Sequence, residues 1–176
     1  MLVKIEILFD RFAEAIGHLI AVFMIAMLLN VFYDVIMRYL FKSSSIAMQE
    51  MEWHLFSLLF LIGSSYALFK DGHVRVDIIY DQLSVKKQAL INILGSVIFL
   101  IPFSLLIAFG SIDFVIEAFH TGEISGDPGG LTHRWIIKAL IPSSFFLLSF
   151  FTIGVIVKNI NLYRGGHVKR HKGRGE

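Results

Sequence analysis

The sequence predicts an all-α integral membrane protein with four transmembrane helices and additional amphipathic or interfacial segments. Apolar residues make up 56% of the 176 positions, above the ~45–50% of an average soluble domain. Because a helix rises ~1.5 Å per residue, ~20 residues cross a hydrocarbon core of ~30 Å. The sequence has four blocks without Asp, Glu, Lys or Arg that suit this length: residues 15–33, 53–69, 88–112 and 139–157.

Allowing for residues at the membrane surface, we expect one transmembrane domain over residues 1–163. The predicted spans are residues 13–37, 50–69, 86–113 and 136–158. Residues 164–176, rich in Gly, Lys, Arg and His, are predicted to form a basic disordered tail on the cytoplasmic side. The four spans leave no room for a folded soluble domain. The first block is interpreted as a retained span, since a small-residue cleavage site is missing.

The distribution of basic residues predicts the orientation in a bacterial inner membrane, because Lys and Arg concentrate on the cytoplasmic side. Twelve of the 16 basic residues lie in the N-terminal segment, the connection around Lys70 and the C-terminal tail. Both termini and that connection are therefore predicted to be cytoplasmic. The formal net charge of +2 is a topology signal and gives no reason to expect a nucleic-acid partner.

The first span is preceded by an amphipathic segment, residues 2–12, which fits either an interfacial helix or an extension of the span. At the other end, Asp34 and Arg38 are four residues apart and can pair on one helix face. The ordinary interpretation is a solvated ion pair. The functional interpretation is a contact with a partner protein.

The second span begins after three serines, of which Ser44 or Ser45 can cap the helix. Glu50, Trp53 and Ser57 then share one face, with His54 beside them. Trp53 suits the membrane interface. Further along, a small-residue face permits close helix approach and consists of Gly63, Ser64 and Ala67.

A polar connection, residues 70–77, separates the second span from the third. Gly72 fits the C′ position of the second helix, and Ser84 is the expected N-cap of the third. Residues 74–83 fit an interfacial segment. Pro102 is expected to bend the third span. The longest loop is expected over residues 113–138, with a turn at residues 126–130.

The residue pattern argues against an enzyme and against an independent carrier. Ionisable groups are missing from the middle of every predicted span, although such groups usually mark a transport path. Paired helix breaks and inverted repeats are also missing. If the chain is extended, alternation places His73, Arg75 and Asp77 on one face. This does not predict a catalytic site, because a catalytic pocket needs converging partners. The chain has no cysteine, which excludes disulfides and Cys-based metal sites.

A haem-binding or anchor subunit of a membrane redox complex is the alternative class. Four-helix bundles can hold haem between two histidines. The predicted topology places His18 and His73 on the cytoplasmic side and His54, His120 and His133 on the outer side. Surface or hydrogen-bonded histidines explain the pattern more simply, because none lies in mid-span facing another. We therefore expect no cofactor in this subunit.

Several motifs in series resemble one family of transporter subunits. They are Arg38-Tyr39, Gln49-Glu-Met-Glu-Trp53-His-Leu-Phe56, Gly63 with Tyr66-Ala-Leu68, Gly72-His-Val-Arg-Val-Asp77, Gly122-Glu-Ile-Ser125, Gly129-Gly-Leu131, Arg134 and Lys138-Ala-Leu-Ile-Pro142. This series is similar to the small membrane subunit (Q or DctQ type) of tripartite ATP-independent periplasmic (TRAP) transporters. The resemblance covers residues 38–146. It departs from the family pattern at Thr132-His133, near which a proline is expected.

The resemblance implies a scaffold for a large M subunit. That subunit binds Na⁺ and moves an organic acid that a soluble periplasmic P protein delivers. The family motif implies that a first group of residues contacts the M subunit or membrane lipids: Arg38, Glu50, Trp53, His73, Arg75 and Asp77. Glu123 and Asp127, in the outer loop, are the candidates for docking of the P protein.

Overall fold

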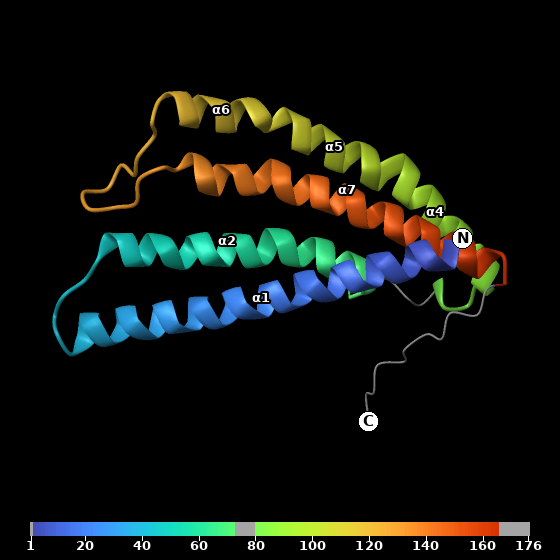
Figure 1. Ribbon diagram of the computed structural model, residues 1–176, viewed down its shortest axis with the longest axis horizontal. Coiled ribbons are helices and arrows are strands. Elements are labelled where there is room, and N and C mark those ends of the chain that lie inside the picture. Colours follow the sequence, from blue (N-terminus) through green and yellow to red (C-terminus); the bar gives the residue numbers. More distant parts are fainter. Residues whose placement is uncertain (1, 73–79, 166–176) are drawn as a thin grey trace.

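The protein is an open layer of long helices, shown face-on in Figure 1. The computed structural model describes residues 2–72 and 80–165, and these residues contain helices and no strand. Four helices are long and apolar enough to cross a membrane in the described part of the chain: Leu2–Tyr39, Ile46–Phe69, Val85–His120 and Trp135–Tyr163. The predicted all-α membrane fold with four spans is therefore confirmed.

Three of the spans are single elements, and the third is composite. The first, second and fourth are α1 (Leu2–Tyr39), α2 (Ile46–Phe69) and α7 (Trp135–Tyr163). The third contains α4 (Val85–Gly95), the π-helix η1 (Ser96–Leu100), α5 (Ile101–Gly110) and α6 (Ile112–His120).

Helix α7 is the centre of the layer. The helices lie side by side in the order α1, α2, α7 and then α4–α6 (Figure 1), and α7 is the element that packs against all the others. In its most apolar 18-residue stretch 33% of the residues are buried, against 11% in each of the other three spans. The chain therefore does not close into a bundle around a common core, and many large apolar side chains are exposed.

The two ends of the layer differ in their connections. The beginning of α1, the end of α2, the beginning of α4 and the end of α7 lie toward one end, here called the termini end. The loops formed by residues 40–45 and 121–134 lie at the other end, here called the loop end (Figure 1).

The apolar core lies near the termini end, where α1, α2 and α7 meet. It consists of Phe9, Ala13, Phe69 and Phe151, all buried. The Phe69 and Phe151 ring centroids are 5.2 Å apart, and those of Phe9 and Phe69 are 6.1 Å apart. Tilted aromatic contacts of this kind add to the burial of the rings. The core therefore fastens the N-terminal helix to both of its neighbours.

Glycine allows this close approach, but at different positions from those that the sequence suggested. A Cβ added at Gly154 would lie 2.7 Å from atoms of the Phe9 and Phe69 rings, and one at Gly17 would lie 3.0 Å from Tyr66. A Cβ at Gly63 would meet no atom within 4 Å in the described part of the chain. Among the described helices Gly63 therefore does not mediate a close approach, and the use of the predicted small-residue face by a partner stays a prediction.

The N-terminal residues extend the first span. Helix α1 begins at Leu2 and continues without a break to Tyr39, a length of ~57 Å at ~1.5 Å per residue. Residues 2–12 therefore form an extension of the first span and not a separate interfacial helix. Within this segment Glu6 is buried, and its Oε2 accepts a hydrogen bond from Asn161 Nδ2 of α7 at 2.6 Å. The polar side chain finds its partner inside the layer.

The expected long loop after the third span is shorter than predicted. Helix α6 (Ile112–His120) continues the third span, and the loop covers residues 121–134. Two acids marked this segment as loop in the sequence, Asp113 and Glu117. Phe114 and Ala118, each directly after one of these acids, are four residues apart as on one helix face, and Ala118 is buried. Burial of this apolar face favours a helix over a loop in this segment.

The end of α2 also differs from the prediction by one residue. Asp71 adopts φ +62°, the left-handed conformation expected at C′. Its N–H donates to Leu68 O at 3.2 Å, and the Gly72 N–H donates to Ala67 O at 2.8 Å. Gly72 is thus the C″ residue of a Schellman motif. Ser45 and Ser84 occupy the predicted N-cap positions of α2 and α4, although neither makes a side-chain capping bond.

The bend predicted at Pro102 takes the form of a π-helical turn. The ring of a proline removes one N–H donor and clashes with the carbonyl four residues earlier. The turn Ser96–Leu100 widens just before the proline, and the Ile101 N–H donates to Ser96 O, five residues back. Ser104 Oγ then donates to Leu100 O at 2.7 Å. The third span consequently curves along α7 (Figure 1).

Candidate functional site

The loop of residues 121–134 at the loop end has a defined conformation. Helix α6 ends in a Schellman motif with Gly122 at φ +59°, and the Glu123 N–H donates to Ala118 O at 3.0 Å. The predicted turn is present, because Pro128 and Gly129 (φ +83°) lie between Asp127 O and the Gly130 N–H, 3.0 Å apart. This is the geometry of a type II turn.

Two further backbone hydrogen bonds join the two arms of the loop. The Ser125 N–H donates to Leu131 O at 3.0 Å, and the Arg134 N–H donates to Glu123 O at 3.1 Å. His133 adopts φ +60°, which is uncommon for a non-glycine residue. The loop is therefore a narrow hairpin-like extension, with Asp127, Pro128 and Gly129 exposed at its tip.

Glu50 of α2 fastens this loop to the layer. Its side chain is buried, with 7% exposure. Ser125 Oγ donates to Oε1, and the Leu131 N–H donates to Oε2 at 2.5 Å. The two donors lie on opposite arms of the loop, so one carboxylate holds both arms. His54 Nδ1 lies 2.5 Å from the backbone oxygen of Glu50.

A second charged cluster lies at the base of the loop. The Glu123 carboxylate pairs with Lys138 Nζ, and its Oε1 is 3.6 Å from Arg134 Nε. Lys138 Nζ also lies 3.8 Å from the centre of the Phe114 ring, and the Arg134 guanidinium lies 5.8 Å from that of Trp53. The two cations therefore connect the loop to α6 and α2.

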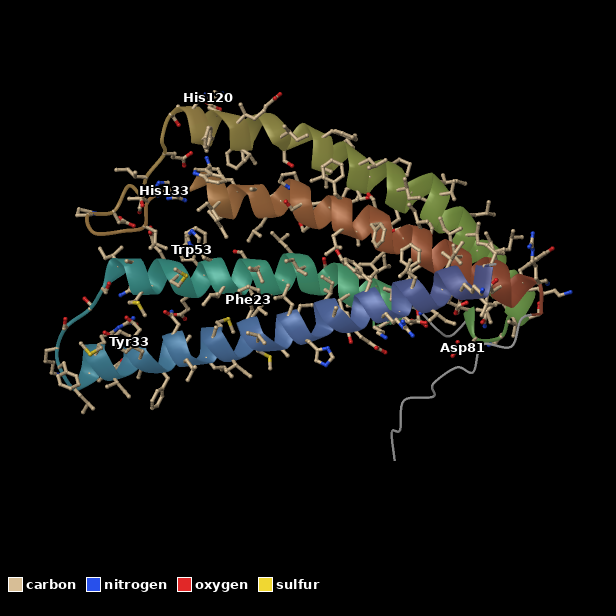
Figure 2. The ribbon with its side chains drawn as sticks, viewed as in Figure 1. Phe23, Tyr33, Trp53, Asp81, His120 and His133 are labelled. Atoms are coloured by element: carbon tan, nitrogen blue, oxygen red, sulfur yellow. The ribbon has the colours of Figure 1, made fainter. Side chains whose placement is uncertain are left out.

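An apolar groove of about 400 Å³ lies below this cluster, between α2 and α7. Figure 2 shows Trp53 on α2 in the space facing α7. The lining is almost entirely apolar and comes from α2, α6, α7 and the residue before α7: Trp53, Phe56, Ser57, Phe60, Leu61, Phe114, Arg134, Ile137, Lys138 and Ile141. Trp53 thus belongs to the groove, and Glu50 belongs to the loop attachment above it.

The other predicted site residues are distributed over the layer. Arg38 pairs with Asp34, whose side chain is 3% exposed, near the loop end of α1. Glu123 is held inside the loop cluster, whereas Asp127 is exposed at the tip. His73, Arg75 and Asp77 lie outside the described residues, as do most of the expected interfacial segment and the tail beyond residue 165.

Sequence reasoning did not find the contacts of Glu50. Ser125 and Gly130 belong to the motif segments at residues 122–125 and 129–131, but their partner lies more than 70 residues earlier in the chain. A Cβ on Gly130 would lie 2.5 Å from Ser125 Cβ and 2.8 Å from Glu50 Oε2. The glycine is thus required by close packing, which single-sequence patterns do not reveal.

The described histidines each have a local partner. His18 Nδ1 lies 2.8 Å from Glu14 O, and His133 Nδ1 lies 2.8 Å from Thr132 Oγ1. Figure 2 shows His120 and His133 on either side of the loop. Over residues 2–72 and 80–165, no three His, Cys, Asp or Glu side chains come together as metal ligands would.

An open helical layer with a structured loop at one end, and outward apolar faces along its length, defines a multi-pass membrane subunit. The model of the family "Tripartite ATP-independent periplasmic transporters, DctQ component" matches residues 27–162. The chain belongs to this family, and it is a small permease subunit of a TRAP transporter in the inner membrane.

Two curated relatives agree with this assignment. A protein of Haemophilus influenzae that bears the name TRAP transporter small permease protein is 30% identical over 119 residues. The match covers 68% of this chain and 74% of that relative. The C4-dicarboxylate TRAP transporter small permease protein DctQ of Vibrio cholerae is 32% identical over 102 residues, which cover 57% of this chain and 44% of that relative.

Proposed function

We propose that this subunit is the fixed scaffold of its transporter. It binds a large M subunit, which carries the Na⁺ sites and moves an organic acid, and a periplasmic P protein delivers that substrate. The observation that carries the proposal is the open layer, in which only 11% of the residues in the apolar stretches of three spans are buried. Such a layer offers broad surfaces and encloses no central path among the described residues.

The exposed apolar surface is large on both flanks of the layer. Monomeric soluble proteins rarely expose contiguous apolar patches above a few hundred Å², and here lipid or a partner must cover the surface. On α1 the exposed apolar residues include Leu19, Val22, Ile25, Leu29 and Phe32. On the third span they include Val97, Phe99, Phe103, Leu106 and Phe109. We assign these flanks to lipid and to the M subunit.

Transport chemistry is assigned to the partners. Two pairs of described polar groups bond across the layer: Ser104 Oγ lies 2.7 Å from Ser149 Oγ, and Asn92 Nδ2 donates to Asn159 Oδ1 at 2.9 Å. They serve helix packing, as polar groups commonly do in membranes. We therefore place the Na⁺ sites in the M subunit and no cofactor or catalytic centre in this chain. An organic acid agrees with the C4-dicarboxylate in the name of the Vibrio relative.

The orientation follows from the basic residues. The described residues at the termini end are the start of α1, the end of α2, the start of α4 and the end of α7. The sequence segments that begin or end at these positions hold most of the lysines and arginines. The rule that basic segments stay inside assigns this end to the cytoplasm. The loop end then faces the periplasm, where the P protein meets the loop of residues 121–134.

Co-purification tests the scaffold. The subunit, produced together with the large membrane subunit of its transporter, should remain bound to that partner in mild detergent. In liposomes, the complex should take up substrate when the binding protein and a Na⁺ gradient are present, whereas this subunit alone should show no uptake. A complex with a haem or flavin protein would instead support the redox-anchor alternative.

Charge reversal at the loop tip tests docking. Asp127 is exposed, and its N–H is already bonded to Ser125 Oγ at 3.1 Å, so its carboxylate can change with little effect on the loop. Asp127→Lys should raise the binding-protein concentration needed for half-maximal uptake by about tenfold, since a like charge across an interface is costly. Asp113→Lys, on the exposed surface of α6, is the control. Equal uptake curves for wild type and Asp127→Lys would contradict docking at the tip.

A further inference from the structure

We infer that Glu50 is a positioning residue, whose carboxylate fixes the conformation in which the loop of residues 121–134 meets the binding protein. The inference rests on the proposed function for the role of the loop. Its structural part, that Glu50 sets the loop conformation, is independent of what binds there. The family motif suggested instead that Glu50 contacts a partner or lipid.

The geometry shows one carboxylate serving both arms of the loop. Oε1 accepts from Ser125 Oγ on the first arm, and Oε2 accepts from the Leu131 N–H on the second. Ser125 is the buried residue of the loop, with 9% exposure. Ser125 Oγ also accepts from the Asp127 N–H at 3.1 Å. The contact therefore extends from α2 through Ser125 to the exposed tip.

The surroundings make this attachment strong. Hydrogen bonds to an ionised group are about twice as strong as those between neutral groups, and the low dielectric of a buried site strengthens them further. The charged or titratable side chains that act on the carboxylate are Arg134 and His54. Arg134 is also held near Glu123. A buried donor that loses its acceptor carries the full cost of desolvation, so the loop has little freedom to leave Glu50.

The loop has no room for a different arrangement around the carboxylate. A Cβ added at Gly130 would fall 2.8 Å from Glu50 Oε2 and 2.5 Å from Ser125 Oγ. The backbone of the second arm therefore approaches α2 as closely as a glycine allows. This close approach lets the neighbouring Leu131 N–H reach Oε2 at 2.5 Å.

Glu50→Gln is the direct test, because an amide keeps the shape of the side chain but has one acceptor oxygen in place of two. The complex with the large membrane subunit, held in lipid nanodiscs, is followed by hydrogen exchange over residues 121–134. The Leu131 N–H should exchange on the order of tenfold faster in the variant, as expected for the loss of a hydrogen bond to a charged group. Unchanged exchange at Leu131 would overturn the inference.

Glu52→Gln is the matched control. Glu52 lies on the same helix, is partly exposed and undergoes the same change of charge. In Glu52→Gln the hydrogen-exchange rates over residues 121–134 should equal those of the wild type. Equal acceleration in both variants would assign the effect to charge at the membrane surface and would contradict a specific role for Glu50.

Gly130→Ala gives a second route that leaves every charge in place. The added methyl group should push the second arm away from Oε2 and accelerate Leu131 exchange in the same way. If Glu50→Gln fails to assemble with its partner, Gly130→Ala decides the question. Gly126→Ala, where an added Cβ would meet no atom within 4 Å, is its control.

Uptake measurements separate this inference from the proposed function. If the loop loosens in Glu50→Gln and the binding-protein concentration for half-maximal uptake rises at least threefold, both the positioning role and the docking role are supported. If the loop loosens but that concentration is unchanged, Glu50 still sets the loop conformation and docking on the loop is refuted. If the loop keeps its exchange rate, the positioning role fails whatever the uptake.

Discussion

The two ends of the layer are held together by different forces. At the termini end α1, α2 and α7 meet in an apolar core of Phe9, Ala13, Phe69 and Phe151. At the loop end α2 and α7 are separated by a groove of about 400 Å³, and the loop of residues 121–134 connects them through Glu50. Close apolar packing is the main contact at the first end, and hydrogen bonds and ion pairs are the main contacts at the second.

The difference bears on how such a subunit can be rigid and still present a binding surface. Close packing excludes alternative arrangements, because interiors have few voids and respond to small changes in volume. A groove tolerates changes in volume, so the loop end depends on its polar contacts for a unique arrangement. Added atoms should therefore be costly in the apolar core at the termini end and tolerated in the groove at the loop end.

The largest expected effect is that of Gly154→Ala. The added Cβ would lie 2.7 Å from ring atoms of Phe9 and Phe69, and overpacking of this kind typically costs ~1–3 kcal/mol. The free energy of unfolding, measured in mixed micelles of increasing denaturing detergent, should fall by this amount. Gly63→Ala is the control, since a Cβ there would meet no described atom within 4 Å. Equal stability of the two variants would remove the distinction between packed and open helix faces.

A smaller effect is expected for Asn92→Leu in the contact between α4 and α7. Asn92 Nδ2 donates to Asn159 Oδ1 at 2.9 Å and to Tyr80 Oη at 2.7 Å. Hydrogen bonds between membrane helices average ~0.6 kcal/mol, with a maximum near ~1.7 kcal/mol. The same unfolding measurement should show a loss in this range. A double-mutant cycle with Asn159→Leu should recover a coupling of similar size; additive losses would mean that the pair contributes no stability.

The smallest effect is expected for Ser57→Leu, which adds atoms to the groove. Ser57 lines the groove, and its hydroxyl donates only to Trp53 O of its own helix at 2.7 Å. The unfolding free energy should stay within ~0.5 kcal/mol of the wild type. Ser65→Leu is the comparison variant and should lower the free energy of unfolding more. Ser65 is fully buried on the same helix, and its hydroxyl donates to Ser144 O at 3.3 Å. A large loss at Ser57 would show that the groove is closed in the assembled protein.

Much of the fold could be predicted from local properties of the sequence. The four apolar blocks gave the four spans, since their lengths match the hydrocarbon core. Pro102 predicted the bend in the third span, and residues 126–130 predicted the turn. The extent of α6 was missed, because Asp113 and Glu117 obscured the apolar face that buries Ala118. Gly72 was predicted at the C′ position of α2 but lies at C″, because Asp71 adopts the left-handed conformation at C′.

The site could be predicted only in part. Glu50 and Trp53 were recognised as motif residues, and Glu123 and Asp127 as docking candidates, but the sequence did not separate their surroundings. The structure places Trp53 in the groove, Glu123 in an internal ion pair and Asp127 at the exposed tip. Which side chain is inside and which is outside depends on how α2, α6 and α7 meet.

The sequence by itself determined that the chain has four helices able to cross a membrane, where the third span bends, and which family the chain belongs to. These properties follow from hydrophobicity, backbone preferences and motif order, all of which are local. Only the tertiary structure decided that the helices form an open layer around α7 and that Glu50 holds a loop more than 70 residues away. Both depend on close approach between distant segments, and apolar periodicity in a membrane helix does not say whether a face meets lipid or another helix.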